Sequence, residues 1–300
     1  MTTPGSTTTP STAGPAGPAT LTDRARAGFA SARPPRLATL LSLAVLGFVA
    51  VAALAPGLLA PGDPTAIRLD QALQSPSATH LLGTDQSGRD LYTRVVHGAR
   101  ESLTIGLGAT ALAMALAVTL GVASGLGGRV TDRVIGGALE VAFAFPVMLL
   151  ALLLVAVRGP SSATLVIAVG IGSAPGYARM VRGQVLAVRR EPYVEAAAAL
   201  GHPRHRVVLQ HVLPNAVRPL LAIATLGVGQ SIVWASGLAF LGMGVAPPSP
   251  EWGALLEAGR MYVTTAWWLE VVPGLAIVAV AVALTTLGRT LQQRLEGAPS

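Results

Sequence analysis

The chain has 300 residues, of which 52% are apolar and only 12% are charged. With a mean hydropathy of +0.59, it is too uniformly apolar for one soluble core and is typical of an integral membrane protein. The absence of cysteine excludes disulfides, thiolate metal sites and a cysteine nucleophile. The net charge of +7 comes from arginine without lysine. Because membrane topology accounts for the placement of these arginines, we expect no nucleic-acid partner.

Residues 1–36 are rich in Thr, Pro, Ala, Gly and Ser. We expect a disordered tail, because this composition buries too little apolar surface to offset the entropy of ordering. An apolar run over residues 37–60 follows and is long enough to cross a bilayer. The tail lacks a basic start, and Pro56 after Ala55 is a poor cleavage site, so we expect an uncleaved first span rather than a signal peptide.

Five further apolar runs have the length of a spanning helix, at residues 102–128, 134–157, 161–181, 217–243 and 269–288. Six spans put both termini on one side, and arginine gives the orientation because cytoplasmic segments carry the excess of positive charge. With a cytoplasmic N-terminus, 15 of the 21 basic residues lie inside. The six outside are Arg68, Arg89, Arg94, Arg100, Arg158 and Arg260. The sequence therefore predicts cytoplasmic termini and a cytoplasmic segment at residues 182–216.

That cytoplasmic segment predicts a helical hairpin. Residues 191–200 (EPYVEAAAAL) are strong helix formers, and Pro192 falls in the first turn, where proline is tolerated. Gly201 supplies a helix stop, a second short helix fits residues 204–212, and Leu213-Pro214 is expected to bend the chain back towards the membrane. Such a protruding element can dock into a groove on a partner.

The hairpin carries a spaced motif, formed by Glu195, Ala196, Ala197, Gly201, Leu213 and Pro214. An alanine-rich chain contains Glu-Ala-Ala by accident, but the fixed offsets of the other residues make chance a poor explanation. The motif resembles the signature of the permease subunits of ABC importers. His211 stands where the general signature has Ile, and His-Val-Leu-Pro-Asn is similar to the dipeptide, oligopeptide and nickel branch. The resemblance implies a coupling helix seated in a cleft of a separate ATP-binding subunit, with Glu195 and Gly201 at the contact.

A second motif lies in the predicted external loop before the second span. It resembles the C-type permease subunits of peptide and nickel importers, through Gly83, Thr84, Asp85, Gly88, Arg89, Asp90, Arg94, Gly98, Arg100, Ser102 and Leu103. The residues themselves predict a turn at Gly83-Thr84-Asp85, with Thr84 or Asp85 capping an amphipathic helix that begins near Gly88 and lies at the membrane interface.

Two alternatives stay open for this loop. Asp85, Arg89 and Asp90 could serve only to shape it, through local hydrogen bonds and ion pairs. Metal binding by His80, Asp85, Asp90 and His97 is the other alternative, but their spacing is not a compact ligand pattern. We therefore expect no metal site.

The C-terminal part, at residues 238–253 and 258–275, also resembles the C-type subunits, so the resemblance covers about residues 37–295. Three positions depart from the family pattern. Ala235 and Arg289 stand where acidic residues are common, and Trp267 stands where proline is common. The aromatic residues are expected in a belt at the outer membrane interface, or at a contact with a substrate-binding protein; they are Trp252, Tyr262, Trp267 and Trp268.

Glu140 is the one clear acid within a predicted span. Because a charge in the bilayer is costly, we expect its side chain to face the helix bundle or water, either on the solute pathway or in a hydrogen bond to a neighbouring helix. Pro146 and Pro175 are expected to loosen their helices. Gly121 and Gly125 are expected to permit close helix contact.

The sequence therefore predicts an all-α membrane protein with six transmembrane helices and a cytoplasmic coupling hairpin. A disordered tail (1–36) precedes the six-span permease domain (37–295), and a short C-terminal tail (296–300) follows. The resemblance implies the type I ABC importer permease fold in a bacterial cell membrane. It also implies three kinds of partner, namely a second, B-type permease subunit, two ATP-binding subunits and an extracytoplasmic substrate-binding protein. The implied cargo is peptides or similar small solutes, nickel chelates included.

The chain has no G-x-x-x-x-G-K-[ST] phosphate loop, so we expect it to bind no cofactor and its partner subunits to hydrolyse ATP. A secondary transporter is the alternative, but inverted repeats and broken helices with intramembrane charges are not evident. An enzyme is disfavoured because H-E-x-x-H, G-x-S-x-G and a cysteine nucleophile are all missing.

Overall fold

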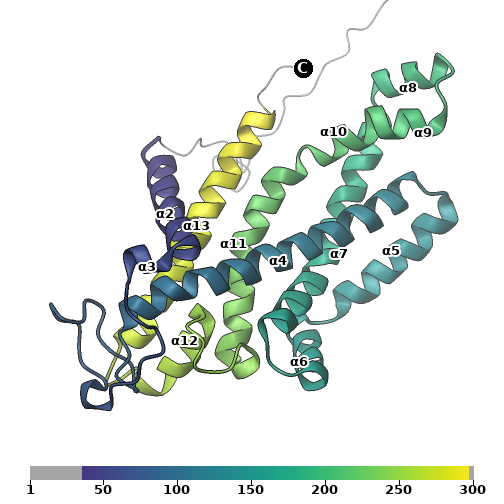
Figure 1. The fold of residues 1–300 in the computed structure, drawn as a ribbon. Coiled ribbons are helices and arrows are strands. Elements are labelled where there is room, and N and C mark those ends of the chain that lie inside the picture. Colours follow the sequence, from purple (N-terminus) through teal and green to yellow (C-terminus); the bar gives the residue numbers. More distant parts are fainter. Residues whose placement is uncertain (1–35, 297–300) are drawn as a thin grey trace, which may run out of the picture. The chain divides into compact units, whose positions relative to one another are not determined.

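The computed structural model describes residues 36–296, which form helices joined by loops (Figure 1). Five helices are long and apolar enough to cross a membrane, and a bent pair raises the count to the predicted six. The five are α2 (Arg36–Leu54), α4 (Leu91–Leu126), α7 (Ser162–Val188), α11 (Leu220–Leu238) and α13 (Trp268–Glu296), and the pair is α5 (Arg129–Ala144) with α6 (Val147–Arg158). Apart from Arg36, the predicted N-terminal tail lies outside the described residues, as do residues 297–300.

Shorter helices lie between the spans. The first long loop contains α3 (Pro56–Leu59) and the 3-10 turn η1 (Leu69–Gln71). Between α7 and α11 come α8 (Pro192–Ala199), α9 (Arg204–Val207), the π-helical turn η2 (Val208–Val212) and α10 (Leu213–Val217). The π-helical turn η3 (Ala239–Met243) continues α11, and α12 (Trp252–Gly259) with the 3-10 turn η4 (Arg260–Tyr262) precedes α13.

The third span, predicted at 134–157, is broken at Phe145-Pro146, so the expectation that Pro146 loosens its helix is confirmed. The axes of α5 and α6 differ by 85°. Proline has no N–H to continue the helix, and it drives the residue before it towards extended backbone. Phe145 accordingly has ψ of 124°. Pro175, in contrast, lies inside α7 without ending it.

The second span is longer than predicted. α4 begins at Leu91 rather than near residue 102, and it runs unbroken for 36 residues. The interfacial helix and the span that the sequence predicts separately are therefore one helix. Its first turns are buried rather than laid on a membrane surface, because Leu91, Val96 and Ala99 join the core formed with α2, α12 and α13.

α4 packs along α7, and glycine permits the close approach, as predicted. A Cβ on Gly121 would stand 2.6 Å from the Val181 Cβ, and one on Gly125 would stand 2.7 Å from the Val185 Cγ1. α11 lies against α4 and α13, and α13 lies against α2 (Figure 1). This arrangement leaves α8 and α9 projecting beyond the ends of α5 and α7 (Figure 1).

Two of the four residues of the predicted aromatic belt are buried inside the chain, which corrects the prediction for them. Trp252 and Trp268 are buried, and their indole N–H groups donate to the backbone oxygens of Val95 at 2.9 Å and Thr84 at 3.2 Å. Trp267 is exposed, and Tyr262 is half-buried. Because a buried indole needs a hydrogen-bond acceptor, Trp252 and Trp268 instead join the C-terminal helices to the start of α4 and the loop before it.

Candidate functional site: a docking hairpin and a clasped loop

The hairpin, residues 191–217, turns at a glycine with left-handed backbone. Gly201 has φ of +81°, a conformation that a Cβ would disfavour. The N–H of Gly201 donates to the Ala198 oxygen at 3.0 Å, and that of His202 donates to the Ala197 oxygen at 3.3 Å. This pattern is a Schellman motif, which closes the last turn of a helix. The predicted glycine stop is therefore confirmed.

The first arm of the hairpin has one buried and one exposed face. Val194 and Ala197 are buried, in a cluster with residues of the second arm and of α7. Glu195 and Ala196 are exposed, and Leu200 at the tip is 79% exposed. The Glu-Ala-Ala motif is thus divided, because Ala197 anchors the arm while Glu195 and Ala196 are presented outward.

The second arm does not bend at Leu213-Pro214 as predicted. Helical turns continue from Arg204 to Val217, and the five residues before Leu213 form the π-helical turn η2. Proline at position 214 supplies no N–H to the turn before it and crowds the carbonyl of Gln210. The wider π turn accommodates both effects without ending the helix.

His211 lies on the inner side of the hairpin. Its ring is half-buried between Tyr193, at 6.5 Å between ring centroids, and His202, at 6.4 Å. Leu213 is also half-buried, while Pro214 is exposed. His211 therefore packs the two arms together and is not on the outward face that carries Glu195.

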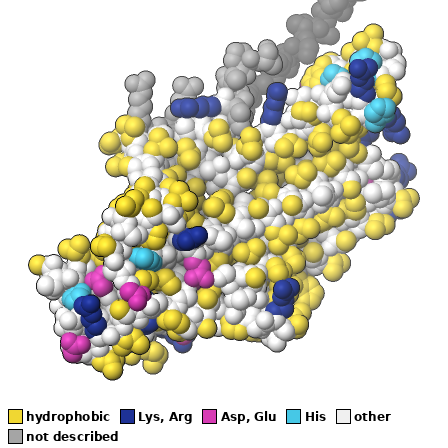
Figure 2. All heavy atoms as spheres, in the orientation of Figure 1, with side chains coloured by type: hydrophobic (Ala, Val, Ile, Leu, Met, Phe, Trp, Pro, Cys, Tyr) yellow, Lys and Arg dark blue, Asp and Glu magenta, His cyan; other side chains and the backbone are white. Residues whose placement is uncertain are grey.

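Arginines close to the base of the hairpin join α7 to the neighbouring long helices. Arg182 of α7 forms a two-pronged ion pair with Asp132 of α5, with N–O distances of 2.6 and 2.7 Å. Arg189 at the end of α7 donates to the Gly125 oxygen of α4 at 2.6 Å. Figure 2 shows arginine and histidine side chains gathered over the hairpin and apolar side chains over the long helices.

The second predicted motif forms a clasp around the Asp85 carboxylate. Asp85 accepts hydrogen bonds from the Ser87 and Arg89 N–H groups at 2.8 and 3.0 Å and pairs with the Arg89 Nε at 2.7 Å. Arg94 of α4 donates to the same carboxylate and also to the Pro248 and Ser249 oxygens, at 3.2 and 3.0 Å. Because Arg94 is only 2% exposed, this clasp fixes the loop, α4 and the turn before α12 to one another.

Backbone geometry explains the glycine in this clasp. Gly88 has φ of +72°, and a Cβ there would overlap the Arg68 backbone. The buried Thr84 hydroxyl donates to the Gln71 oxygen at 2.5 Å and accepts from the Gln74 N–H at 2.8 Å. These contacts agree with the alternative in which the residues of this motif serve to shape the loop.

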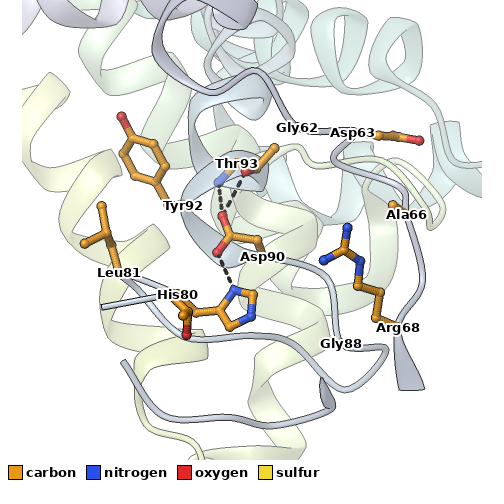
Figure 3. A pocket seen from close by; sticks show the side chains of 11 residues that line it. Gly62, Asp63, Ala66, Arg68, His80, Leu81, Gly88, Asp90, Tyr92 and Thr93 are labelled. Carbon is orange, nitrogen blue, oxygen red and sulfur yellow. Dashed lines mark hydrogen bonds and ion pairs between the residues drawn. The ribbon is translucent and has the colours of Figure 1, made fainter. Parts of the chain in front are cut away.

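The helix cap differs from the prediction. Asp90, not Thr84 or Asp85, caps α4, because its carboxylate accepts from the Thr93 N–H at 2.8 Å and its backbone is extended. The other Asp90 oxygen lies 3.1 Å from the His80 Nδ1 (Figure 3). These residues line a pocket of about 300 Å³, into which Arg68 also projects (Figure 3).

The four metal-ligand candidates have separate partners. His80 and Asp90 contact each other, Asp85 faces the two arginines, and the His97 Nε2 lies 3.0 Å from the Ala60 oxygen. No group of three His, Cys, Asp or Glu side chains within residues 36–296 is arranged to hold a metal ion.

Two acidic residues that sequence reasoning missed contact Ser249, whose backbone oxygen also accepts from Arg94. Glu251 is 1% exposed and caps α12, accepting from the Gly253 and Ala254 N–H groups at 2.9 and 2.8 Å. Burial raises its pKa above the ordinary value. Glu101 accepts 2.6 Å hydrogen bonds from the hydroxyls of Ser162 and Ser249. An acid directly before an apolar helix was the available signal for Glu251.

Comparison with known proteins identifies the family. The model of the binding-protein-dependent transport system inner membrane component family matches residues 117–298, which include the whole hairpin. This chain belongs to that family. It is an integral, multi-pass permease subunit of the ABC importer type, and the family description implies further subunits. The comparisons favour this function over the secondary transporter.

Relatives of this permease match over most of their length. The dipeptide transport system permease protein of Alkalihalophilus pseudofirmus is 37% identical over 90% of this chain and 89% of its own. The probable D,D-dipeptide transport system permease protein of Escherichia coli is 40% identical over 79% of this chain and 80% of its own. The glutathione transport system permease protein of Pectobacterium atrosepticum is 36% identical over 85% and 84%.

Solved permease structures share the fold. An inward-facing methionine ABC transporter has a TM-score of 0.56 at 17% identity, over 67% of this chain and 96% of that one. An amino acid ABC transporter solved with histidines has a TM-score of 0.56 at 15% identity, over 68% and 94%. At this level of identity the likeness concerns the fold alone.

Three further positions can be placed in the permease fold. Glu140 is exposed on α5, so within this chain its side chain faces away from the other helices. Ala235 is buried in α11, and Arg289 is exposed on α13. Glu140 makes no hydrogen bond to a neighbouring helix among the described residues, so its place on the solute pathway stays a prediction.

Proposed function

We propose that this permease forms half of the translocation pathway of a peptide importer and that a separate ATPase drives it through the hairpin. The observation that carries the proposal is the outward face of the hairpin, where Glu195 and Ala196 are exposed on an arm that Val194 and Ala197 anchor. A rigid arm of this kind transmits a displacement of its partner to the helices that it joins. Relatives named for dipeptide, D,D-dipeptide and glutathione transport support peptides as cargo.

The proposed assembly contains this chain, a second, B-type permease subunit, two ATP-binding subunits and an extracytoplasmic substrate-binding protein. Both termini and the hairpin lie in the cytoplasm of a bacterial cell, an orientation that arginine placement supports. ATP binding closes the ATPase pair, the hairpin follows, and the spans move between inward-open and outward-open states. This chain is not an enzyme, and ATP is bound and hydrolysed by its partners.

Charge reversal on the outward face tests the docking. In the variant Glu195→Arg, we expect co-purification of the ATPase and uptake of a labelled dipeptide to fall about tenfold or more, since a wrongly placed charge at an interface costs several kcal/mol. The variant Asp70→Arg is the matched control, because Asp70 is an exposed acid in the first long loop. Equal ATPase recovery from both variants would refute the docking, and uptake by this chain alone without ATP would refute the importer.

A further inference from the structure

A cavity of about 240 Å³ lies between the hairpin and the ends of two spanning helices. Val194, Val207 and Val212 form its apolar floor, and its polar lining consists of Arg189, His202 and Arg204. Leu126, the last residue of α4, closes one side. The cavity therefore joins a cationic rim to an apolar base.

The cationic rim has unused hydrogen-bond donors. Among the residues that the structure describes, no acidic side chain lines the cavity. Arg189 uses its Nη1 for the Gly125 oxygen at 2.6 Å, which leaves its other N–H groups available. Arg204 is exposed, and within residues 36–296 its side chain has no hydrogen-bond or ion-pair partner. Guanidinium groups present paired donors that match the oxygens of a phosphate.

The cavity also lies at the ends of two helices that are long and apolar enough to span the membrane. Leu126 ends α4 and Arg189 caps the end of α7, and both helices span the membrane. α5 begins three residues after Leu126 and exposes Val130, at 74%, and Val134, at 65%. These side chains give the start of α5 an exposed apolar surface, and a lipid with an anionic headgroup requires such a surface for its acyl chains.

From this arrangement we infer that the cavity binds the phosphate of an acidic phospholipid headgroup, held by Arg189 and Arg204 over the apolar floor. The bound lipid contacts both hairpin arms and the ends of α4 and α7, so it stabilises the hairpin against the long helices. An acidic membrane therefore strengthens the connection between the hairpin and the spans. This inference depends on the membrane-spanning fold and not on the identity of the cargo or the ATPase.

The test titrates the full chain in detergent with dioleoylphosphatidylglycerol or dioleoylphosphatidylcholine and measures bound lipid by native mass spectrometry. We expect the wild type to prefer phosphatidylglycerol. In the double variant R189Q/R204Q we expect its affinity for that lipid to fall about tenfold or more, because two charge-assisted contacts are lost. The matched control R190Q/R206Q removes the same charge from two exposed arginines that do not line the cavity, and it should bind within about twofold of wild type.

The single variant Arg204→Gln separates lost lipid binding from a folding defect. Within the described residues the Arg204 side chain makes no hydrogen bond or ion pair, so its replacement should not disturb the fold. It should still weaken phosphatidylglycerol binding. Equal lipid binding by the cavity and control variants would overturn the inference. Full displacement of the lipid by inorganic phosphate or glycerol 1-phosphate would assign the site to a soluble anion instead. If R204Q loses ATPase co-purification while its lipid binding is unchanged, the cavity would be assigned to an acidic group of the ATPase.

Discussion

Single buried charges decide the structure of the first long loop. Asp85 is surrounded by two arginines and two backbone N–H groups, so its charge is compensated where water cannot reach it. Arg94 in turn joins that carboxylate to two backbone oxygens more than 150 residues further along the chain. Breaking a buried pair on one side leaves an uncompensated charge, so the clasp holds only when all of its members are present.

Glu251 gives this region a pH dependence. Burial outweighs its hydrogen bonds and raises its pKa above the ordinary value of 4.5. Below the ordinary value the carboxyl is protonated in both the folded and the unfolded chain, and its contribution to stability is complete. As the pH rises through the raised folded pKa, the buried carboxyl must ionise and this contribution is lost.

We therefore expect the Tm of the purified chain to fall as the pH rises above the ordinary glutamate pKa of 4.5, and the variant Glu251→Gln to flatten this dependence. The Tm at each pH is measured by thermal unfolding, with intrinsic tryptophan fluorescence as the signal, since Trp252 directly follows Glu251. Glu257→Gln, on the same helix, is the control and should keep the wild-type slope. Parallel profiles for wild type and Glu251→Gln would contradict the assignment.

The residue types in the two motifs could be predicted from the sequence, but their contacts could not. Spacing along the chain placed Glu195, Gly201 and Asp85 in the hairpin and the loop. That Arg94 reaches the turn at Pro248-Ser249, and that Trp252 and Trp268 are buried, depends on contacts between distant segments. No local pattern encodes these contacts. Apolar periodicity alone is equally consistent with an aromatic belt at the membrane interface.

At the scale of elements, close packing of α4 on α7 depends on the absence of side chains. The variant Gly121→Ala would place a Cβ 2.6 Å from the Val181 Cβ and 2.7 Å from the Ala178 oxygen. We expect it to destabilise the chain by about 1–3 kcal/mol, because overpacking forces side chains and backbone to shift. Gly47→Ala on α2 is the control, since nothing lies within 4 Å of the added Cβ.

Thermal unfolding in detergent compares the two glycine variants. Gly47→Ala should leave stability unchanged or raise it slightly, because alanine is the better helix former. If Gly121→Ala unfolds at the same temperature as Gly47→Ala, the helices are not in the close contact described.

Element boundaries were harder to predict than this contact. The apolar runs did not reveal that α4 continues through the polar residues 91–101, nor that Pro146 divides the third span while Pro175 leaves α7 whole.

For the whole molecule, arginine placement predicts the orientation, and the absence of native cysteine provides the means to test it. The chain has no cysteine, so single cysteines report their own side of the membrane. We expect Asp70→Cys, in the first long loop, to react with a membrane-impermeant maleimide in intact cells. Leu200→Cys, at the exposed hairpin tip, should react only after the cells are permeabilised. The reverse labelling pattern would invert the orientation and remove the hairpin from the ATPase.

With its 36 residues, α4 is longer than a helix needs to be to cross a membrane. At about 1.5 Å per residue the helix is about 54 Å long, well beyond the roughly 30 Å of bilayer hydrocarbon. One end is locked into the Asp85 clasp, and the other meets α7 where Arg189 binds the Gly125 oxygen. Because α4 is one continuous helix, we expect a tilt imposed at its hairpin end to reach the loop at its other end. A change on one face of the membrane would in this way move the opposite face.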